Sequence, residues 1–433
     1  MSEPSPVDFS GYLDGLENLG IEPSLLGIEA LCHELANPQS RFDTIQVTGT
    51  NGKTSTSRMI QALLSASGLT VGVYTSPHLE DYRERIMVDG VQISEADFSD
   101  IGGLVQEKAR VAEQSLAGRR ITQFEVITAA AFEYFARRAV KVAVLEGGMG
   151  ARWDATSLVA PEVGVVTNVS LDHAGWLGPK LEDIAGEKAY VIQEGNSVII
   201  GPVSRVVMRI FDERATAVGA YLLKNGEHFS KSVRDSGELE LVTPKGAYFG
   251  ISLGASGPWQ AENALLAAVS AETYLDNPLE PKTVRNVLDT VKVPGRAELV
   301  PGSPEYLLDG AHNRAGIERL VSFLRSQYQG RRLIFLVSIL RDKEAPGMVA
   351  DLCHLGNKII FTSSKNPRCY EPDELKELAS HSSAREVLSL EMGSAIKEAA
   401  AVAGDEGLVV VTGSLFLVGA VRKLLRNQGS IFA

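Results

Sequence analysis

Residues 43–55 read DTIQVTGTNGKTS and lead directly into a helical pattern that continues to residue 66. The first six residues are rich in β-branched side chains and predict a buried strand. Gly49 and Gly52 let the following loop turn backbone N–H groups toward an anion, and Lys53 adds a point charge where the helix begins. A strand, a glycine-rich turn and a helix in this order predict a phosphate-binding loop.

This loop departs from the usual G-x-x-x-x-G-K-[ST] spacing, because Val47 occupies the place of the first glycine. The hydroxyl of Thr54 or Ser55 can bind a phosphate-associated Mg²⁺. A Gly-Lys-Thr run is common in loops, but it is uncommon between a β-rich hexamer and an amphipathic helix. We therefore expect the chain to bind a nucleotide.

The composition is that of a globular protein with more than one core. The chain has 433 residues, 44% hydrophobic and 22% charged, so two or three domains are expected. A net charge of −12 without a Lys/Arg cluster argues against nucleic acid or an anionic membrane as a partner. Three widely spaced cysteines fit a reducing compartment without a zinc site. The N-terminal residues lack a basic region followed by an apolar run, so we expect a cytoplasmic protein.

Short apolar runs alternate with helical patterns, which predicts parallel βαβ architecture. Residues 236–252 alternate differently and predict an antiparallel hairpin on the sheet edge. The strands are expected at 43–48, 70–75, 141–146, 162–168 and 196–200, and the helices at 24–36, 53–66, 94–115, 123–138, 203–215, 260–275 and 281–291.

A second β/α series follows a candidate linker at residues 293–296. We therefore predict an α/β protein with a P-loop domain over 1–293, built on a parallel-rich sheet, and a smaller Rossmann-like α/β domain over 294–433. The strands of this second series are expected at 305–309, 332–338, 357–361 and 407–412, and its helices at 314–327, 344–354, 372–380, 393–402 and 415–426.

Two polar residues follow predicted strands, where α/β sheets place ligands. Glu146 closes strand 141–146 and runs into the glycine-rich residues 147–150. A glutamate at a strand end is often solvated or a cap. His173 follows strand 162–168, but a lone histidine is more often structural and Mg²⁺ prefers oxygen. The spacing alone leaves a metal role for both residues open.

Taken together, these segments resemble the folylpolyglutamate synthase/dihydrofolate synthase branch of the Mur ligases. The phosphate loop and Asp309-Gly310-Ala311-His312-Asn313 are similar to the wider Mur family, whereas Thr75-Ser76-Pro77-His78-Leu79 and the run 148–156 narrow the resemblance to the folate branch. The matching segments are 49–53, 74–79, 84–86, 124–125, 145–156, 171–173, 177–178, 187–189, 260–264, 294–296, 308–313 and 413–415.

The resemblance implies an ATP-dependent ligase of folate biosynthesis. Such an enzyme phosphorylates a carboxylate, and the amine of L-glutamate then displaces phosphate to form an amide. The carboxylate belongs to dihydropteroate, to the γ-carboxylate of a folyl-glutamate, or to both. ATP and Mg²⁺, with two ions, are the implied cofactors, because cations offset the charge on the transferred phosphoryl group.

The resemblance also implies roles for individual residues at the nucleotide. Lys53, Glu146, His173 and Lys188 are the implied catalytic residues, and Lys188 matches a lysine that the family carries as a carbamate able to hold a second Mg²⁺. Without the resemblance, Lys188 looks like a solvated helix residue. The implied ATP contacts are Thr50, Asn51, Gly52, Lys53, Thr54, Asn263 on the adenine side, Arg296 and Asp309, and the implied metal ligands are Ser76, Glu146 and His173.

For the pterin-bearing substrate, the resemblance points to two segments. Phe124 and Trp153 offer flat faces for stacking a ring, and Asp154 offers an acceptor for ring N–H groups. Core packing remains an alternative for Phe124, and an N-cap role explains Ser414 as well as a glutamate carboxylate site does. The full set is Thr122, Gln123, Phe124, Glu125, Trp153, Asp154, Ala155, His312 and Ser414.

Four positions depart from the commoner folate-branch pattern and leave the shape of the pterin pocket open, namely Thr54, Gly147, Ala151 and Trp153. One competing hypothesis is a cell-wall Mur ligase acting on a UDP-muropeptide. Such enzymes carry an extra N-terminal domain, and only about 42 residues precede the first strand here. A P-loop switch or transport ATPase and a non-catalytic folate-binding paralogue are further alternatives. We expect a monomer whose partners are small molecules.

Overall fold

The structure, a computed structural model, describes residues 7–16, 23–172, 174–364, 366–381 and 386–427. The chain forms two compact units. The first comprises Met1–Val169, Pro179–Leu253 and Ala261–Val291, and the second comprises Ser170–Gly178, Gly254–Gln260 and Lys292–Ala433.

An eight-stranded sheet runs through the first unit in the order β4-β3-β2-β5-β1-β6-β7-β8. Strands β2, β5, β1, β6, β7 and β8 are parallel, and β3 and β4 add an antiparallel edge. The strands are β1 (Asp43–Thr48), β2 (Val71–Tyr74), β3 (Ile86–Val88), β4 (Val91–Gln92), β5 (Val142–Glu146), β6 (Val163–Val166), β7 (Ser197–Ile200) and β8 (Tyr221–Lys224).

The register at the centre of this sheet decides where the site lies. Val47 of β1 pairs with Glu146 at the end of β5, and Thr48 pairs with Val166 at the end of β6. The three parallel strands therefore end level with one another. Parallel sheets bind ligands at the carboxyl ends of their strands, so the segments that follow β1, β5 and β6 meet at one edge.

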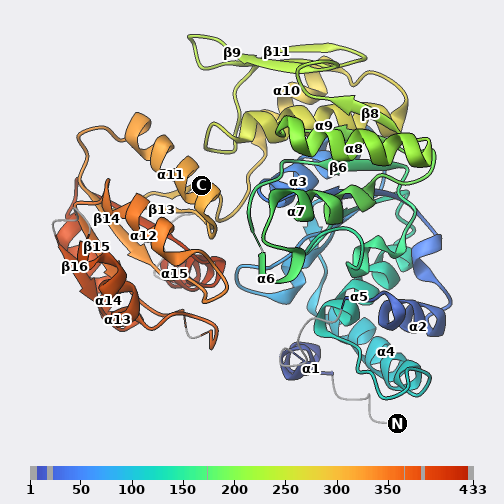
Figure 1. Ribbon diagram of the computed structural model, residues 1–433, viewed down its shortest axis with the longest axis horizontal. Helices are drawn as coiled ribbons and strands as arrows, with labels where there is room; N and C mark the ends of the chain where they lie inside the picture. The colour runs from blue at the N-terminus through green and yellow to red at the C-terminus, as the bar shows by residue number, and fades with distance from the viewer. Residues whose placement is uncertain (1–6, 17–22, 173, 365, 382–385, 428–433) are drawn as a thin grey trace. The chain divides into compact units, whose positions relative to one another are not determined.

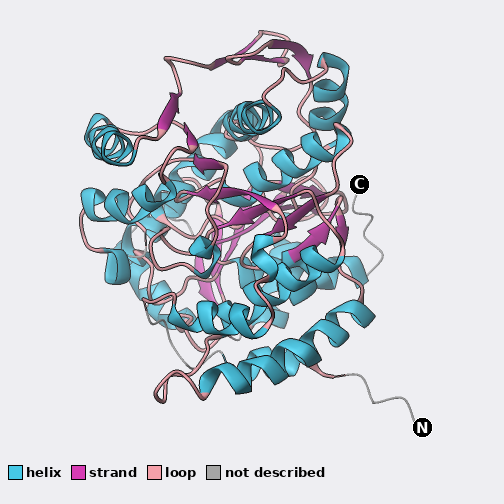
Figure 2. Ribbon diagram, turned by 90° about the vertical axis from the view of Figure 1, so that its right-hand side faces the viewer, coloured by secondary structure: helices cyan, strands magenta, loops and turns pink. Residues whose placement is uncertain are grey.

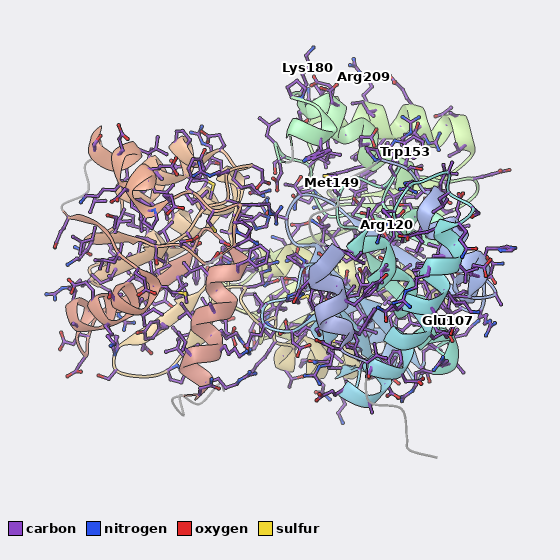
Figure 3. The ribbon with its side chains drawn as sticks, turned by 90° about the horizontal axis from the view of Figure 1, so that it is seen from below. Glu107, Arg120, Met149, Trp153, Lys180 and Arg209 are labelled. Carbon is purple, nitrogen blue, oxygen red and sulfur yellow. The ribbon has the colours of Figure 1, made fainter. Side chains whose placement is uncertain are left out.

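Helices cover this sheet, and Figure 2 shows helices on both sides of the strands. One core cluster joins α1 (Phe9–Leu16), α2 (Leu26–Glu34), α4 (Glu95–Glu113) and α5 (Gln123–Arg137) to side chains of β2 and β5. Another joins α7 (Leu181–Lys188) and α8 (Arg205–Val218) to β6 and β7. Charged side chains such as Glu107 of α4 and Arg209 of α8 point outward (Figure 3), as expected for amphipathic helices. The phosphate loop leads into α3 (Lys53–Ala66).

The predicted hairpin is present, but its predicted place at the edge of the main sheet is wrong. Strands β10 (Leu239–Val242) and β11 (Ala247–Ile251) pair with β9 (Ser230–Val233) in a separate antiparallel sheet. The sheet lies against helix α10 (Pro281–Thr290) (Figure 1), and the hydroxyls of Thr243 and Tyr248 also connect it to helix α9 (Gln260–Leu275) by donating to the buried carboxyl of Glu272.

The second unit contains a six-stranded sheet in the order β12-β13-β17-β14-β15-β16, in which only β12 is antiparallel. This arrangement is Rossmann-like, and together with the first unit it confirms the predicted fold class. The strands are β12 (Glu298–Val300), β13 (Glu305–Leu308), β14 (Leu333–Val337), β15 (Lys358–Phe361), β16 (Val387–Ser389) and β17 (Leu408–Thr412), and the helices are α11 (Arg314–Gln327), α12 (Ala345–Cys353), α13 (Pro372–Leu378), α14 (Met392–Ala403) and α15 (Leu415–Asn427).

Several short elements were not predicted, among them α1, α7 and the edge strands β3, β4, β9, β12 and β16. Strands of two to four residues carry too little alternation to be recognised. The predicted domain limits, 1–293 and 294–433, remain a prediction, and the compact units differ from them because Ser170–Gly178 and Gly254–Gln260 group with the second unit. Among the described residues, no helix is both long and apolar enough to cross a bilayer.

Candidate functional site

The two glycines of the phosphate loop occupy positions that exclude any side chain. Gly49 has a φ of 144° and Gly52 a φ of 87°. A Cβ atom at Gly49 would lie 1.9 Å from Thr167 Oγ1, and one at Gly52 would lie 2.4 Å from Asn263 Oδ1. Only glycine tolerates both the backbone angle and the close approach. Asn263, which was predicted on the adenine side of ATP, therefore lies directly against the loop.

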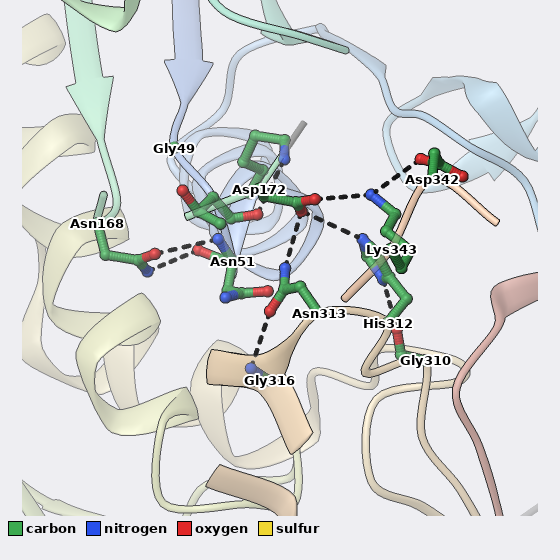
Figure 4. A network of polar contacts seen from close by, with 12 residues as sticks. Gly49, Asn51, Asn168, Asp172, Gly310, His312, Asn313, Gly316, Asp342 and Lys343 are labelled. Atoms are coloured by element: carbon green, nitrogen blue, oxygen red, sulfur yellow. Dashed lines mark hydrogen bonds and ion pairs between the residues drawn. The ribbon is translucent and has the colours of Figure 1, made fainter. Parts of the chain in front are cut away.

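The residues after β6 hold the phosphate loop in place. The Asn51 backbone N–H donates to Asn168 Oδ1 at 3.1 Å, and Asn168 Nδ2 donates back to the Asn51 carbonyl at 2.8 Å (Figure 4). The Thr50 N–H donates to the Asn168 carbonyl at 3.0 Å. Lys53 Nζ donates to the Thr50 carbonyl at 3.2 Å, so its ammonium lies over the loop. Hydrogen bonds within the protein therefore define the shape of the loop.

The buried carboxylate of Glu146 contacts two other predicted site residues. Its side chain is 1% exposed. Oε1 accepts from Thr54 Oγ1 at 2.9 Å, and Oε2 accepts from the Ser76 N–H at 3.2 Å. Residues from β5, α3 and the loop after β2 thus meet where the strands end. Carboxylate and hydroxyl oxygens are the donors that Mg²⁺ prefers.

The described residues contain no group of three or more His, Cys, Asp or Glu side chains able to hold a metal ion. His173, the third predicted metal ligand, lies outside the described residues. The oxygen donors around Glu146 are therefore the part of the predicted metal site that the structure describes.

Lys188 is not the solvated helix residue that its sequence context alone indicates. It is 4% exposed, and its Nζ donates to the Gly49 carbonyl at 2.9 Å. The buried face of α7 is formed by Ile184, Ala185 and Lys188. Because residues four apart share a helix face, Lys188 continues the apolar stripe and ends at the phosphate loop.

In the second unit, Asp309 and Arg296 are neighbours, as their joint assignment to ATP requires. Asp309 is 4% exposed and accepts from the Ala297 and Ala311 N–H groups at 2.8 and 2.9 Å. Burial raises the pKa of the Asp309 carboxyl, and the charge of Arg296 opposes this. The Arg296 guanidinium donates to the Gly310 carbonyl at 3.3 Å.

A polar cluster in the second unit includes two residues that sequence reasoning missed, Asp172 and Lys343 (Figure 4). Their side chains are 6% and 5% exposed and form an ion pair at 2.7 Å. Asn313 Nδ2 donates to Asp172 Oδ2 at 2.8 Å, and His312 Nε2 lies 3.8 Å from the same oxygen. Burial, aided by the charge of Lys343, lowers the pKa of His312 to about 4. The sequence signal that could have pointed to Asp172 was its position next to His173.

Two candidates on the substrate side, Thr122 and Glu125, form a capping box at the start of α5. Glu125 Oε2 accepts from the Thr122 N–H and hydroxyl at 2.8 and 2.9 Å. Its other oxygen pairs with Arg119 at 3.2 Å, with both side chains buried. Because these atoms cap a helix, their contacts are explained without a substrate.

The two aromatic candidates differ in exposure. Phe124 packs partly buried against the core, and a Cβ atom at Gly148 would lie 2.9 Å from its ring, so the core-packing alternative describes part of its role. Trp153 is 44% exposed and lies in the same loop as Met149 (Figure 3). The Arg152 guanidinium stacks 4.7 Å from the Trp153 ring.

Asp154 uses both of its oxygens within its own loop. Oδ2 accepts from the Gly148 and Met149 N–H groups, each at 2.8 Å, and Oδ1 accepts from the N–H and hydroxyl of Thr156 at 3.0 and 2.6 Å. Burial raises the pKa of Asp154, although these hydrogen bonds oppose it. Its predicted role as an acceptor for ring N–H groups stays a prediction. Ala155 beside it is buried.

Ser414 precedes α15, and its hydroxyl accepts from the Phe416 N–H at 3.2 Å. The side chain is 1% exposed. This is the N-cap geometry that the sequence left open as an alternative.

Comparison with known proteins places this site in a family. Residues 47–271 match the family described as the Mur ligase middle domain, and residues 295–415 match the Mur ligase glutamate ligase domain. The dihydrofolate synthase/folylpolyglutamate synthase of Mycobacterium tuberculosis is 33% identical over 93% of this chain and 90% of that protein. The Escherichia coli protein of the same name is 28% identical over 97% of this chain and 95% of that protein.

Solved structures of folylpolyglutamate synthases are also similar to this chain. M. tuberculosis folylpolyglutamate synthase complexed with ADP superposes with a TM-score of 0.90 at 33% identity, covering 96% of this chain and 97% of that one. E. coli FolC in complex with DHPP and ADP gives 0.89 at 27% identity, covering 99% and 100%. The fold and the phosphate-loop site define an ATP-dependent ligase of the Mur type. More narrowly, the chain belongs to the folylpolyglutamate synthase/dihydrofolate synthase branch of the Mur ligase family, and this favours the folate hypothesis over the cell-wall alternative.

Proposed function

We propose that this protein joins L-glutamate to dihydropteroate, to the γ-carboxylate of folyl-glutamates, or to both, through an acyl phosphate made from ATP. The observation that carries the proposal is the buried Glu146 carboxylate, which accepts from Thr54 and Ser76 where the phosphate loop leads into α3. A carboxylate is a poor acyl donor, and phosphorylation supplies the leaving group that the glutamate amine displaces.

The residues of the loop act by position and charge. The Lys53 ammonium offsets negative charge on the transferred phosphoryl group, and the N–H groups at the start of α3 face the same region. Asn168 fixes the loop backbone through hydrogen bonds to Asn51, which limits the reorganisation needed for nucleotide binding. A fixed arrangement of donors is what makes such charge stabilisation effective.

The donor set around Glu146 fits Mg²⁺, since the carboxylate and the Thr54 hydroxyl that contacts it are oxygen donors, and the Ser76 N–H places a further hydroxyl-bearing residue beside them. We assign these residues, with His173, to one ion. When bound, Mg²⁺ neutralises phosphate charge and orients the phosphates for attack.

Lys188 is assigned to a second ion as a carbamate, formed when its neutral amine adds to CO₂ and a proton is released. Its burial against the Gly49 carbonyl supports the assignment, because it places the Lys188 nitrogen at the phosphate loop. Lys188→Ala should lose most activity and regain part of it with acetate or propionate, which can fill the vacated space with an anion. Lys180→Ala, at the exposed start of α7, is the matched control. Full activity of Lys188→Ala would refute the carbamate.

The activity itself is tested by phosphate release from ATP. Glutamate is supplied with dihydropteroate in one arm and with tetrahydrofolate in the other, and Lys53→Ala enzyme controls for contaminating ATPases. Phosphate release that requires both glutamate and a pteridine acceptor supports the proposal, and the two arms distinguish one activity from both. Release that is independent of any acceptor would instead indicate a hydrolysing ATPase.

We further propose that the protein is a cytoplasmic monomer. Cys32, Cys353 and Cys369 are buried thiols, which fits a reducing compartment. Light scattering coupled to size exclusion tests the oligomeric state, and a mass of about 93 kDa rather than the 46.5 kDa of one chain would contradict the monomer.

A further inference from the structure

Gln123, the first residue of α5, has a side-chain amide whose orientation is fixed. Its Nε2 donates to the Leu13 carbonyl at 2.9 Å and to the Tyr82 hydroxyl oxygen at 2.9 Å. A backbone carbonyl can only accept, so the amide group that faces Leu13 must be the NH₂ group. Both N–H donors of the side chain are therefore used inside the protein.

The amide oxygen of Gln123 is left as the recognition atom. Within the described ranges, no group donates a hydrogen bond to Gln123 Oε1. The side chain is partly exposed, and Oε1 does not belong to the buried polar atoms that lack a partner. Gln123 thus presents an accessible acceptor and has no N–H donor left for a ligand.

Tyr82 enforces this orientation through the direction of its own hydroxyl. It donates its single hydrogen to Asp14 Oδ1 at 2.9 Å, so the oxygen accepts from Gln123. The ring of Tyr82 is held by His78, whose ring centroid is 4.4 Å away, and by the Arg85 guanidinium at 5.2 Å. The hydroxyl cannot turn toward Gln123 without giving up the carboxylate, which is the stronger acceptor.

Helix α1 supplies two of the atoms in this arrangement, the Leu13 carbonyl and the Asp14 carboxylate. The helix is seated by Phe9, Leu13 and Leu16, which are 1%, 0% and 5% exposed. Phe9 packs on Phe98 of α4 with ring centroids 4.9 Å apart. A short helix that would be marginal alone is thereby fixed, and with it the orientation of Gln123.

We propose that Tyr82 and Asp14 are positioning residues that make Gln123 accept a hydrogen bond from an N–H or amino group of the pteridine ring. This inference rests on the proposed function and on the family resemblance, which assigns Gln123 to the pterin-bearing substrate. Reduced pterins carry ring N–H groups and an exocyclic amine, so an acceptor matches them. A flipped amide would place an N–H donor opposite those donors. Burying unmatched donors costs affinity, so the arrangement selects for the pteridine end of the substrate.

The test separates positioning from structural support. Gln123→Leu should weaken dihydropteroate binding roughly 10- to 100-fold, and Tyr82→Phe, which keeps the ring between His78 and Arg85, about 3- to 10-fold. In each case KM for dihydropteroate should rise while kcat and KM for ATP stay within about twofold of wild type. Tyr134→Phe, which removes a hydroxyl of the same helix that contacts Arg138 just after the helix ends, is the control.

Two further comparisons show whether Tyr82 and Asp14 act through Gln123. In a Gln123→Leu background, Tyr82→Phe should add no further loss, because the group it orients is gone. Asp14→Asn keeps an acceptor for the Tyr82 hydroxyl and should retain most affinity, whereas Asp14→Ala should behave like Tyr82→Phe. Thermal unfolding of each variant shows that it is folded before binding is compared.

The outcomes distinguish this inference from the proposed function. If Gln123→Leu binds dihydropteroate like wild type, or if the losses from Tyr82→Phe and Gln123→Leu simply add, the inference is overturned while the enzyme remains a folate ligase. If wild-type protein neither binds nor consumes a pteridine under calorimetry and the phosphate assay, the proposed function itself is wrong.

Discussion

The phosphate loop and the start of α5 were both predicted to bind ligands, and their polar atoms are used differently. Around the loop, Thr54 and Ser76 each donate a hydrogen bond to Glu146, so three segments of the chain meet at one carboxylate. At the start of α5, Thr122 and Glu125 contact each other within a single turn. Contacts between side chains from distant segments are not explained by local secondary structure. The contacts of a capping box are explained by the helix that it caps.

The contacts at the two regions separate the residues that can still bind a ligand from those whose polar atoms are already used within the protein. A resemblance assigns a role to a position, but the contacts show which atoms of that position are available to a ligand. Asp154 uses both oxygens to hold residues 148–156, whereas Gln123, beside Thr122, keeps one acceptor open. Substitutions should therefore affect turnover at the loop and stability at the capping and loop-holding residues.

The largest effect is expected at Lys53. Lys53→Ala should lower kcat by at least 100- to 1,000-fold, because the ammonium that offsets phosphoryl charge is removed. Its unfolding midpoint should match wild type, since the side chain is only partly buried. Lys245→Ala, which removes a surface pair with Asp276, is the control. Turnover like that of wild type would remove the phosphate-loop assignment.

Glu146→Gln should shift the Mg²⁺ requirement rather than the fold. The amide can still accept from Thr54 but supplies no negative charge. The Mg²⁺ concentration that gives half-maximal activity should therefore rise by about 10-fold or more. A Mg²⁺ titration of initial rates measures this, with His173→Ala as the parallel variant. Unchanged metal dependence in both would place the metal site elsewhere.

Asp154→Ala tests the residues whose polar atoms are used within the protein. Four donors of its loop lose their acceptor, so the free energy of unfolding should fall by about 2–4 kcal/mol in urea titrations. Ser232→Ala, which removes one exposed hydrogen bond to Glu240, should change little. Wild-type stability combined with a raised KM for dihydropteroate would show that Asp154 contacts the substrate after all.

Glu272, a buried carboxyl outside both regions, should give the smallest effect. Burial raises its pKa above the ordinary glutamate value of 4.5, although the hydrogen bonds from the Tyr248 and Thr243 hydroxyls oppose this. The folded state therefore binds more protons than the unfolded state, and stability falls as pH rises from about 4.5 through the folded pKa. Glu272→Gln removes this titration. Its unfolding midpoint relative to wild type should therefore increase over that interval, and a difference independent of pH would contradict the assignment.

Much of the phosphate site could be predicted because its signals are local. The strand, the two glycines and Lys53 lie within one stretch, and strand ends place Glu146 at the same edge. The partners could not be predicted. Lys188 reaches Gly49 across 139 residues, and Asn263 approaches Gly52 from α9, contacts that no periodicity encodes.

In the fold, too, features with a local sequence signal were predicted, and features that depend on contacts between distant residues were not. Long helices and buried parallel strands have clear periods, so α3, α5, β1 and β14 were predicted to within a residue or two. The three-stranded sheet was misplaced because its attachment depends on Tyr248 and Glu272, which are 24 residues apart. The Asp172–Lys343 pair was missed because a lone aspartate and a lone lysine in loops normally face solvent.

The position of β1 between β5 and β6 has a consequence for the order of events during translation. The phosphate loop follows β1 at residue 48, yet β6, which is followed by the loop-holding Asn168, ends only at Val166. The ribosome therefore adds about 120 further residues, roughly 6–24 s of synthesis, before the nascent loop can be shaped. During that interval β1 has no strand in the β6 position, and an unpaired strand edge on an incompletely folded chain is the kind of surface that chaperones bind. A nucleotide cannot assist the folding of this unit until nearly 40% of the chain has been made.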